Sequence, residues 1–268
     1  MHYLDEGSRE HPVVLLLHGN PTWSYMYRNL IIELRKTHRC IVPDHMGCGL
    51  SDKPNLKGFS YDLKGHSQNI FDLLEHLSIQ RFSLVVHDWG GAIGFTAFRN
   101  ELDRLKEFVL LNTAAFTSRD VPKRILLCRL PLLGGFLVRG LNGFAWPATY
   151  MATTKGLSER TKSELLFPYN NWKNRIAVWR FVKDIPYEKN HPTYSLLLET
   201  ESKLVELRNT RSLACWGMKD FCFHPGFLSQ WKNMLPNLHS KEYSDAGHYL
   251  LEDANIDCNE KISGFFRA

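Results

Sequence analysis

A stretch of twelve residues constrains the fold more than any other part of this chain. Residues 83–94 read SLVVHDWGGAIG. The opening run is apolar and rich in β-branched residues, which predicts a short buried strand, and the three glycines that follow open a segment compatible with a helix. A strand, a sharp turn and a helix therefore meet at His87, Asp88 and Trp89. Such a turn lifts one side chain above the carboxyl end of the strand.

The residue at this turn is an aspartate, which limits the chemistry that the site can perform. In the α/β-hydrolase fold the corresponding turn presents the nucleophile, commonly a serine. The carboxylate of Asp88 is ionised at neutral pH without a base, and its attack on carbon forms an ester with the substrate. Because attack on a carbonyl would give a reactive anhydride, an aspartate suits displacement at the saturated carbon of an alkyl halide, an epoxide or a strained lactone. An isolated aspartate before a helix is more often an N-cap, and the partners described next reverse that preference.

Two later loops carry the partners that an aspartate nucleophile requires. Asp220 and His248 each follow a predicted strand, so both are expected at the same carboxyl edge as Asp88. The order nucleophile, acid, histidine is the one used in this fold. A histidine can activate water near neutral pH to cleave the ester. The rival position for the acid holds Asn112 and Thr113, which carry no carboxylate.

Two further residues are candidates for stabilising a departing anion. Asn20 follows a predicted strand at residues 13–17, and Trp89 is adjacent to Asp88. The amide and indole N–H groups of these residues donate hydrogen bonds, and donors directed at developing negative charge lower the barrier of a reaction. Their backbone N–H groups could also hold the oxyanion that forms during hydrolysis of the ester.

The sequence contains a second motif that resembles a serine nucleophile. Residues 65–69 read GHSQN within a predicted helix at residues 61–77. No strand precedes this serine and no second glycine follows it. We therefore predict that Ser67 lies on the surface of a helix and is not a nucleophile.

The pattern along the chain predicts an α/β fold with an insertion. Strands alternate with helices in residues 1–116 and again in residues 199–268, whereas residues 117–198 contain apolar helical patches broken by prolines. We predict a mostly parallel sheet flanked by helices, with residues 117–198 as an inserted helical cap. With 268 residues and 44% hydrophobic content, the chain can bury the core of one such domain.

Composition excludes several classes of protein. The 33 Lys and Arg are scattered among 28 Asp and Glu without a long basic run, which argues against binding to nucleic acid. The six cysteines show no paired spacing, so we expect reduced thiols in a cytoplasmic protein. We also expect no cofactor, no metal, no signal peptide and no membrane-spanning helix.

The motifs as a set resemble the haloalkane dehalogenase family, and more closely a branch that includes the β-lactone decarboxylases of bacterial olefin biosynthesis. They read HGNPTWSYMYRNL, VPDHMGCGLSDKP, LVVHDWGGAIGF, CWGMKDF and DAGHYLLED, and the resemblance covers nearly the whole chain. By this resemblance Asp88 is the nucleophile, His248 the base and Asp220 the acid that orients it. Asn20 and Trp89 are then the pair that binds the leaving group. The chain starts late for this family, which predicts either that an edge strand is missing or that the chain is truncated.

Four functions are compatible with these residues. Haloalkane dehalogenation, the hydrolysis of a carbon–halogen bond to alcohol and halide, is the first. The alternatives are β-lactone decarboxylation to cis-alkenes, epoxide hydrolysis with two cap tyrosines above Asp88, and a hydrolase fold retained for ligand binding without catalysis. For each of them we expect a small apolar substrate or ligand.

The cap leads to two more expectations. Its aromatic residues are expected to line an apolar pocket, namely Trp146, Tyr169, Trp172, Trp179 and Phe181. The apolar and basic segment at residues 124–143 predicts cap helices packed on the core. It also raises a second hypothesis, that this surface forms a homo-oligomer or docks an enzyme of a lipid pathway.

Overall fold

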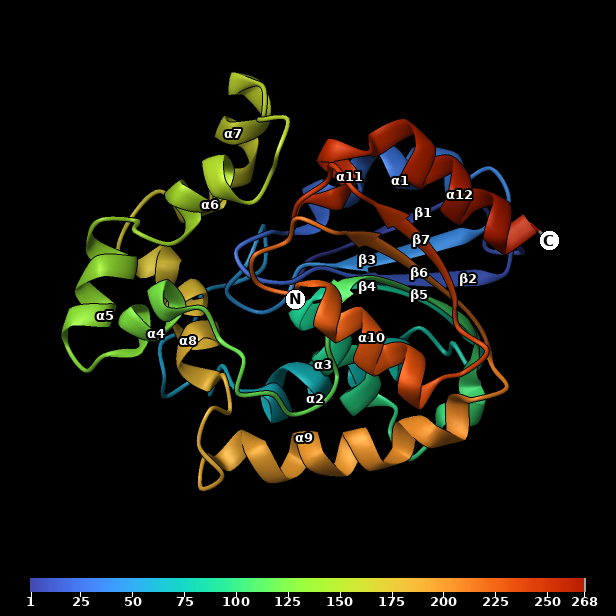
Figure 1. The fold of residues 1–268 in the computed structure, drawn as a ribbon, viewed down its shortest axis with the longest axis horizontal. Helices are drawn as coiled ribbons and strands as arrows, with labels where there is room; N and C mark the ends of the chain where they lie inside the picture. Colours follow the sequence, from blue (N-terminus) through green and yellow to red (C-terminus); the bar gives the residue numbers. More distant parts are fainter. Residues whose placement is uncertain (268) are drawn as a thin grey trace.

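The computed structural model describes residues 1–267 and contains a seven-stranded sheet with helices on both faces (Figure 1). The strands lie in the order β1-β3-β2-β4-β5-β6-β7. β1 runs antiparallel to β3, and the other neighbouring strands are parallel. This confirms the predicted α/β fold with a mostly parallel sheet. The strands are β1 Tyr3–Glu6, β2 Val13–Leu17, β3 Arg39–Pro43, β4 Phe82–Asp88, β5 Leu105–Thr113, β6 Arg211–Gly217 and β7 His239–Tyr243.

The central strands are apolar on both faces because helices cover both sides of the sheet. β2 reads VVLLL and β4 is buried at every position. One face is covered by α2 Leu63–His76, α3 Trp89–Ala97, α9 Pro192–Lys203 and α10 Pro225–Met234. The other face is covered by α1 Arg28–Leu34, α11 Leu250–Asp253 and α12 Asn255–Arg267. With both faces closed, a ligand can reach the strands at their carboxyl ends.

The chain between β5 and α9 forms a group of short helices at one end of the sheet, on the left of Figure 1. These are α4 Lys123–Arg129, α5 Leu133–Gly135, α6 Ala145–Met151, α7 Glu159–Leu166 and α8 Ile176–Asp184. They have an apolar cluster of their own, in which Ile125 and Val138 meet Val178 and Val182 of α8. Packing within this group of helices therefore buries much of the predicted cap.

The predicted boundary between residues 198 and 199 falls inside α9. This helix contacts α2 and α3, and the hydroxyl groups of Thr96 on α3 and Thr200 on α9 are 2.9 Å apart. Leu197 is buried in the same core as the sheet. α9 therefore packs with α2 and α3 on one side of the sheet, and the change from insertion to core comes before Pro192.

The prediction for Ser67 is half wrong. Its side chain is buried at the contact between α2 and α3, where its hydroxyl donates to the carbonyl of Ile93 at 3.2 Å. The residue lies within α2 rather than at the end of a strand. Ser67 is therefore an internal contact between two helices and not a surface residue.

Two remaining features concern the whole described chain. All six cysteines are unpaired, as expected. Among residues 1–267, no helix combines the length and the apolar character needed to cross a membrane. β1 forms one edge of the sheet.

Candidate active site

The turn after β4 holds Asp88 in an unusual backbone conformation. Its φ of +52° lies in the left-handed region, which a residue other than glycine rarely adopts. The hydroxyl of Thr113 donates to the Asp88 carbonyl at 2.5 Å. At Gly90 and Gly91 an added Cβ would come within 2.1 Å of the Leu17 carbonyl oxygen and of the Thr113 hydroxyl, respectively. The two glycines therefore let α3 approach β2 and β5 closely enough to hold the turn.

The two carboxylate oxygens of Asp88 have different surroundings. Oδ1 accepts a hydrogen bond from the backbone N–H of Asn20 at 2.6 Å, whereas Oδ2 faces His248. A Cβ at position 19 would lie 2.0 Å from Oδ1, so Gly19 is required for this approach. Burial raises the pKa of the Asp88 carboxyl, against the opposing effects of His248 and of the N–H groups of Asn20 and Trp89. Oδ1 is therefore held by the Asn20 N–H, and Oδ2 faces the imidazole of His248.

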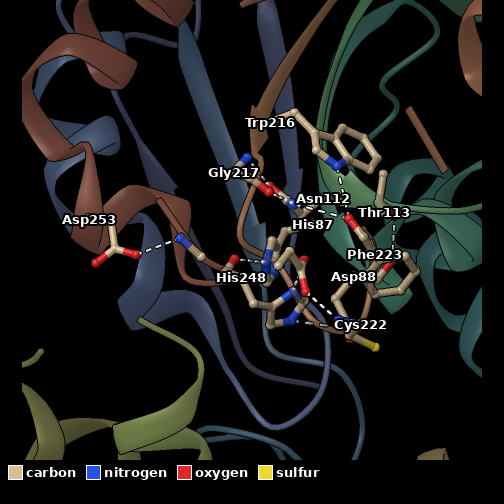
Figure 2. A network of polar contacts seen from close by, with 12 residues as sticks. His87, Asp88, Asn112, Thr113, Trp216, Gly217, Cys222, Phe223, His248 and Asp253 are labelled. Carbon is tan, nitrogen blue, oxygen red and sulfur yellow. Dashed lines mark hydrogen bonds and ion pairs between the residues drawn. The ribbon is translucent and has the colours of Figure 1, made fainter. Parts of the chain in front are cut away.

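The structure brings together the three residues predicted to act as nucleophile, base and acid, and Figure 2 labels two of them, Asp88 and His248. His248 Nδ1 lies 2.7 Å from Asp220 Oδ2, and His248 Nε2 lies 3.8 Å from Asp88 Oδ2. All three side chains are buried. The other oxygen of Asp220 accepts from the backbone N–H of Cys222 at 2.6 Å. Asp220 thus accepts from Nδ1–H and directs Nε2 at Asp88.

The charge state of His248 follows from this arrangement. Burial lowers its pKa, but the carboxylates of Asp220 and Asp88 outweigh that effect and hold the pKa above its ordinary value. A neighbouring imidazole behaves differently, since burial holds the pKa of His87 well below its ordinary value. The site therefore contains one histidine that readily becomes a cation.

Residues that the sequence analysis did not single out hold His248 in place. His87 Nε2 donates to the carbonyl of His248 at 2.9 Å. Asp253 accepts from the N–H of Gly247 at 2.7 Å, and also from the N–H groups of Thr154 and Lys155. Asp253 stood in the DAGHYLLED motif, but its type and spacing give no indication of these distant partners. It joins the histidine loop to the segment that follows α6.

Asn112, at the rival position for the acid, has a structural contact instead. Its side-chain oxygen accepts from the Gly217 N–H at 2.8 Å, and its amide nitrogen donates to the Gly217 carbonyl at 3.0 Å. These bonds join the carboxyl ends of β5 and β6, from which the Asp220 loop departs (Figure 2). An amide can make both bonds because it carries a donor and an acceptor, whereas an ionised carboxylate can only accept.

The predicted leaving-group pair lies beside Asp88. Asn20 and Trp89 both line the cavity that contains Asp88 and His248. The side-chain amide of Asn20 donates one hydrogen bond to the Val178 carbonyl of α8 at 3.2 Å, which leaves its second N–H for a ligand. Among the hydrogen bonds of residues 1–267, none uses the indole N–H of Trp89. Both side chains thus retain a donor.

The cavity has a volume of about 510 Å³ and a largely apolar lining. It lies between the carboxyl edge of the sheet and the inserted helices, and its size is in the range of small-molecule sites. The core contributes Ala114, Phe116 and Phe223, and the insertion contributes Ile125, Leu137, Phe144, Ala148 and Val182. An apolar ligand fits this lining.

The aromatic residues predicted to line the pocket are found elsewhere. None of the five is among the lining residues of the described chain. Phe181 stacks on His66, Tyr169 donates to the Thr22 carbonyl, and Trp146 and Trp172 are exposed. Because helices α6 and α8 could have turned any face to the core, the sequence did not reveal which rings point inward. Tyr249 is the tyrosine that lines the described cavity, and it belongs to the core rather than to the insertion.

Comparison with known proteins assigns the class that this fold and site define. Residues 12–255 match the family model for the alpha/beta hydrolase fold, and the chain belongs to that family. It is 42% identical to the cis-3-alkyl-4-alkyloxetan-2-one decarboxylase of Shewanella oneidensis, over 99% of this chain and 84% of that protein. It is 30% identical to haloalkane dehalogenase 2 of Mycobacterium bovis, over 95% of this chain and 87% of that protein.

A solved structure agrees with this assignment at the level of the fold. The haloalkane dehalogenase DbeA of Bradyrhizobium elkani superposes with a TM-score of 0.91 and 23% identity, over 99% of this chain and 93% of that one. The predicted resemblance is confirmed, and the chain is a haloalkane dehalogenase-like enzyme of the α/β-hydrolase family.

Proposed function

We propose that this enzyme opens and decarboxylates a β-lactone that carries two alkyl substituents, with Asp88 as the nucleophile. The observation that carries the proposal is the 42% identity to an oxetan-2-one decarboxylase over 99% of the chain, compared with 30% to a haloalkane dehalogenase. Oxetan-2-one is the systematic name of a β-lactone. The sequence analysis ranked dehalogenation first, and the comparisons favour the opposite order of these two reactions.

In the first step, Oδ2 of Asp88 attacks the saturated ring carbon that is bonded to the ring oxygen. A carbon–oxygen bond to Asp88 forms while the bond between that carbon and the ring oxygen breaks. The ring oxygen leaves as part of a carboxylate that stays attached to the neighbouring carbon. The donors of Asn20 and Trp89 stabilise this anion, and the hydrogen bond from the Asn20 N–H orients the attacking carboxylate.

In the second step, the carbon–carbon bond to the new carboxylate breaks and carbon dioxide leaves. The electron pair of that bond forms the alkene, and the ester bond to Asp88 breaks, which restores the carboxylate. Attack inverts one carbon and anti elimination follows, so a cis-lactone gives a cis-alkene. No water is consumed and nothing is oxidised or reduced. The cation of His248 stabilises the Asp88 carboxylate as it departs.

Haloalkane dehalogenation is the second candidate, supported by the 30% identity over 95% of the chain and by the two donors beside Asp88. Here Asp88 would displace halide, and the resulting ester would need water. Neutral His248 would remove a proton from that water as it attacks the ester carbonyl, with Asp220 orienting the imidazole. Epoxide hydrolysis has less support, because no tyrosine of the insertion lines the described cavity.

The two reactions are separated by incubating the purified enzyme with a cis-3,4-dialkyloxetan-2-one and, separately, with 1-bromohexane. Alkene is measured by gas chromatography and bromide by ion chromatography, with Asp88→Ala as the control. Alkene above the control supports the proposal, and bromide with no alkene supports dehalogenation. A His248→Phe variant examined by intact mass spectrometry tests covalent catalysis itself. If no substrate class yields an adduct or a product, the fold serves ligand binding.

We also propose that the predicted insertion up to α9, residues 117–191, acts as a cap over the site. This proposal is supported by helices α4, α6 and α8, which line the same cavity as Asp88. The unpaired state of all six cysteines fits the proposed cytoplasmic location.

A further inference from the structure

The outer side of the insertion carries an apolar surface that the active site does not use. We call five exposed residues of the segment that follows α4, at residues 130–141, the apolar tip: Leu130, Leu132, Leu133, Phe136 and Leu141. Leu132 is 92% exposed, and its φ of +59° is costly for a residue other than glycine. The segment was expected to pack on the core, yet only its inner side is buried, against α8. An exposed apolar group of this size marks a contact surface.

The positive charge of the chain is concentrated in the insertion that carries this tip. Residues 117–198 contain 13 Lys and Arg against 5 Asp and Glu, a formal charge of +8. The rest of the chain has 20 basic and 23 acidic residues, so it carries −3 and the total is +5. This separation is hidden in the whole-chain composition. A basic surface with an apolar centre complements an anionic partner that also offers apolar contact.

An arginine and a tryptophan lie next to the tip. The guanidinium of Arg139 is 4.4 Å from the ring centre of Trp172, which is itself about half exposed. A Cβ at Gly140 would contact both Phe136 and Trp172, which places the tryptophan beside the tip. Tryptophan and arginine are typical of protein surfaces at the level of lipid headgroups.

The tip is continuous with the mouth of the active-site cavity. Leu127, Leu141 and Met151 are exposed, and they also line the cavity that contains Asp88 and His248. The cavity therefore reaches the surface beside the tip. An apolar molecule could pass from an apolar medium into the cavity along these side chains.

We propose that the apolar tip and the basic residues around it bind the surface of an anionic lipid bilayer. Leu132, Leu133 and Phe136 enter the boundary between headgroups and acyl chains, and the Lys and Arg side chains contact lipid phosphates. The mouth of the cavity then faces the lipid, from which an apolar substrate enters directly. This binding depends on the surface and not on which reaction the enzyme catalyses.

The first test is flotation of the full chain, without substrate, with vesicles of phosphatidylcholine that contain about a quarter phosphatidylglycerol. The enzyme should float with these vesicles and much less with pure phosphatidylcholine. The double variant Leu132→Ser, Phe136→Ser should reduce the bound fraction at least about tenfold. The matched control is Ile256→Ser on α12. Ile256 is 75% exposed and lies outside the insertion, so its replacement should leave flotation unchanged.

The second test separates local from total charge. Arg119→Glu with Lys123→Glu, both exposed in the insertion, should abolish most of the binding to anionic vesicles. Arg208→Glu with Lys261→Glu makes the same change in total charge at two exposed positions outside the insertion, and it should have little effect on vesicle binding. Melting temperatures confirm that the variants are folded.

Three outcomes would overturn the proposal. The first is equal behaviour of the tip variant and its control, and the second is no flotation with anionic vesicles at all. The third is a dimer in light scattering that the tip variant converts to a monomer while the native protein does not bind vesicles, since the occupant of the tip would then be a second copy of the chain.

Discussion

Asp253 offers the sharpest test of how the fold positions the histidine. The carboxylate is 4% exposed and accepts hydrogen bonds from three backbone N–H groups, those of Gly247, Thr154 and Lys155. Gly247 is buried, so in Asp253→Ala its N–H loses a charged partner and finds no water, at a cost of about 2 kcal/mol. Thr154 and Lys155 are exposed, and water can replace the lost acceptor at about 0.5 kcal/mol each.

The sum is about 3 kcal/mol in the free energy of unfolding, which corresponds to a fall of about 6–10 °C in melting temperature for a chain of this size. Differential scanning fluorimetry and urea unfolding measure this change. Asp253 does not line the cavity, so we expect turnover to fall with little change in KM, because the loop of His248 is displaced. Asp253→Asn keeps one oxygen for Gly247 and should recover part of both losses.

The control is Asp245→Ala, which removes a carboxylate of the same loop that pairs with Lys155 at the surface. Its melting temperature should stay close to that of the native protein, because exposed ion pairs contribute little. If Asp253→Ala melts within about 1 °C of the native enzyme, or loses no more activity than Asp245→Ala, the reasoning from buried hydrogen bonds is refuted.

The remaining predictions concern pH and close packing. Both reactions need ionised Asp88, whose raised pKa should place the acid limit of activity above the usual range of a carboxyl. Dehalogenation also needs neutral His248, so bromide release should fall as the pH drops through the raised pKa of His248, which lies above 6.5. Alkene formation uses the cation of His248 and should persist to lower pH. Identical pH profiles for the two products would contradict the roles assigned to His248. Gly19→Ala should lower kcat/KM by about a hundredfold or more, since its Cβ would lie 2.0 Å from Asp88 Oδ1, and near-native kinetics would show that the carboxylate can move aside. Ser67→Ala should keep its activity while unfolding at slightly lower urea, and a loss of turnover would reinstate this serine as a candidate nucleophile.

The sequence predicted the strands, their parallel pairing and the loops that carry Asp88, Asp220 and His248. These features depend on local patterns, because a buried strand followed by glycines or a polar loop is recognisable within about ten residues. Since the carboxyl ends of parallel strands meet at one edge, the three residues were expected together. The structure places one nitrogen of the His248 imidazole 2.7 Å from a carboxylate oxygen of Asp220 and the other 3.8 Å from one of Asp88.

The insertion was less predictable. Its helices are short and broken by prolines, and each could have turned a different side to the core. The pattern therefore indicated which residues make up the insertion, but not which of its aromatic rings point inward. It also did not show where the insertion ends and α9 begins to pack against α2 and α3.

What the sequence by itself determined is the set of candidate groups: a carboxylate at a tight turn, an imidazole that comes later, and no competing serine at the end of a strand. Only the tertiary structure decided which oxygen of Asp88 faces His248, that Asp253 restrains the histidine loop, and that an apolar basic surface lies at the mouth of the cavity. The physical reason is that each of these depends on contacts between segments far apart in the chain. Asn20 and Asp88 are separated by 68 residues, and Thr154 and Asp253 by 99, and no local pattern records such a pair.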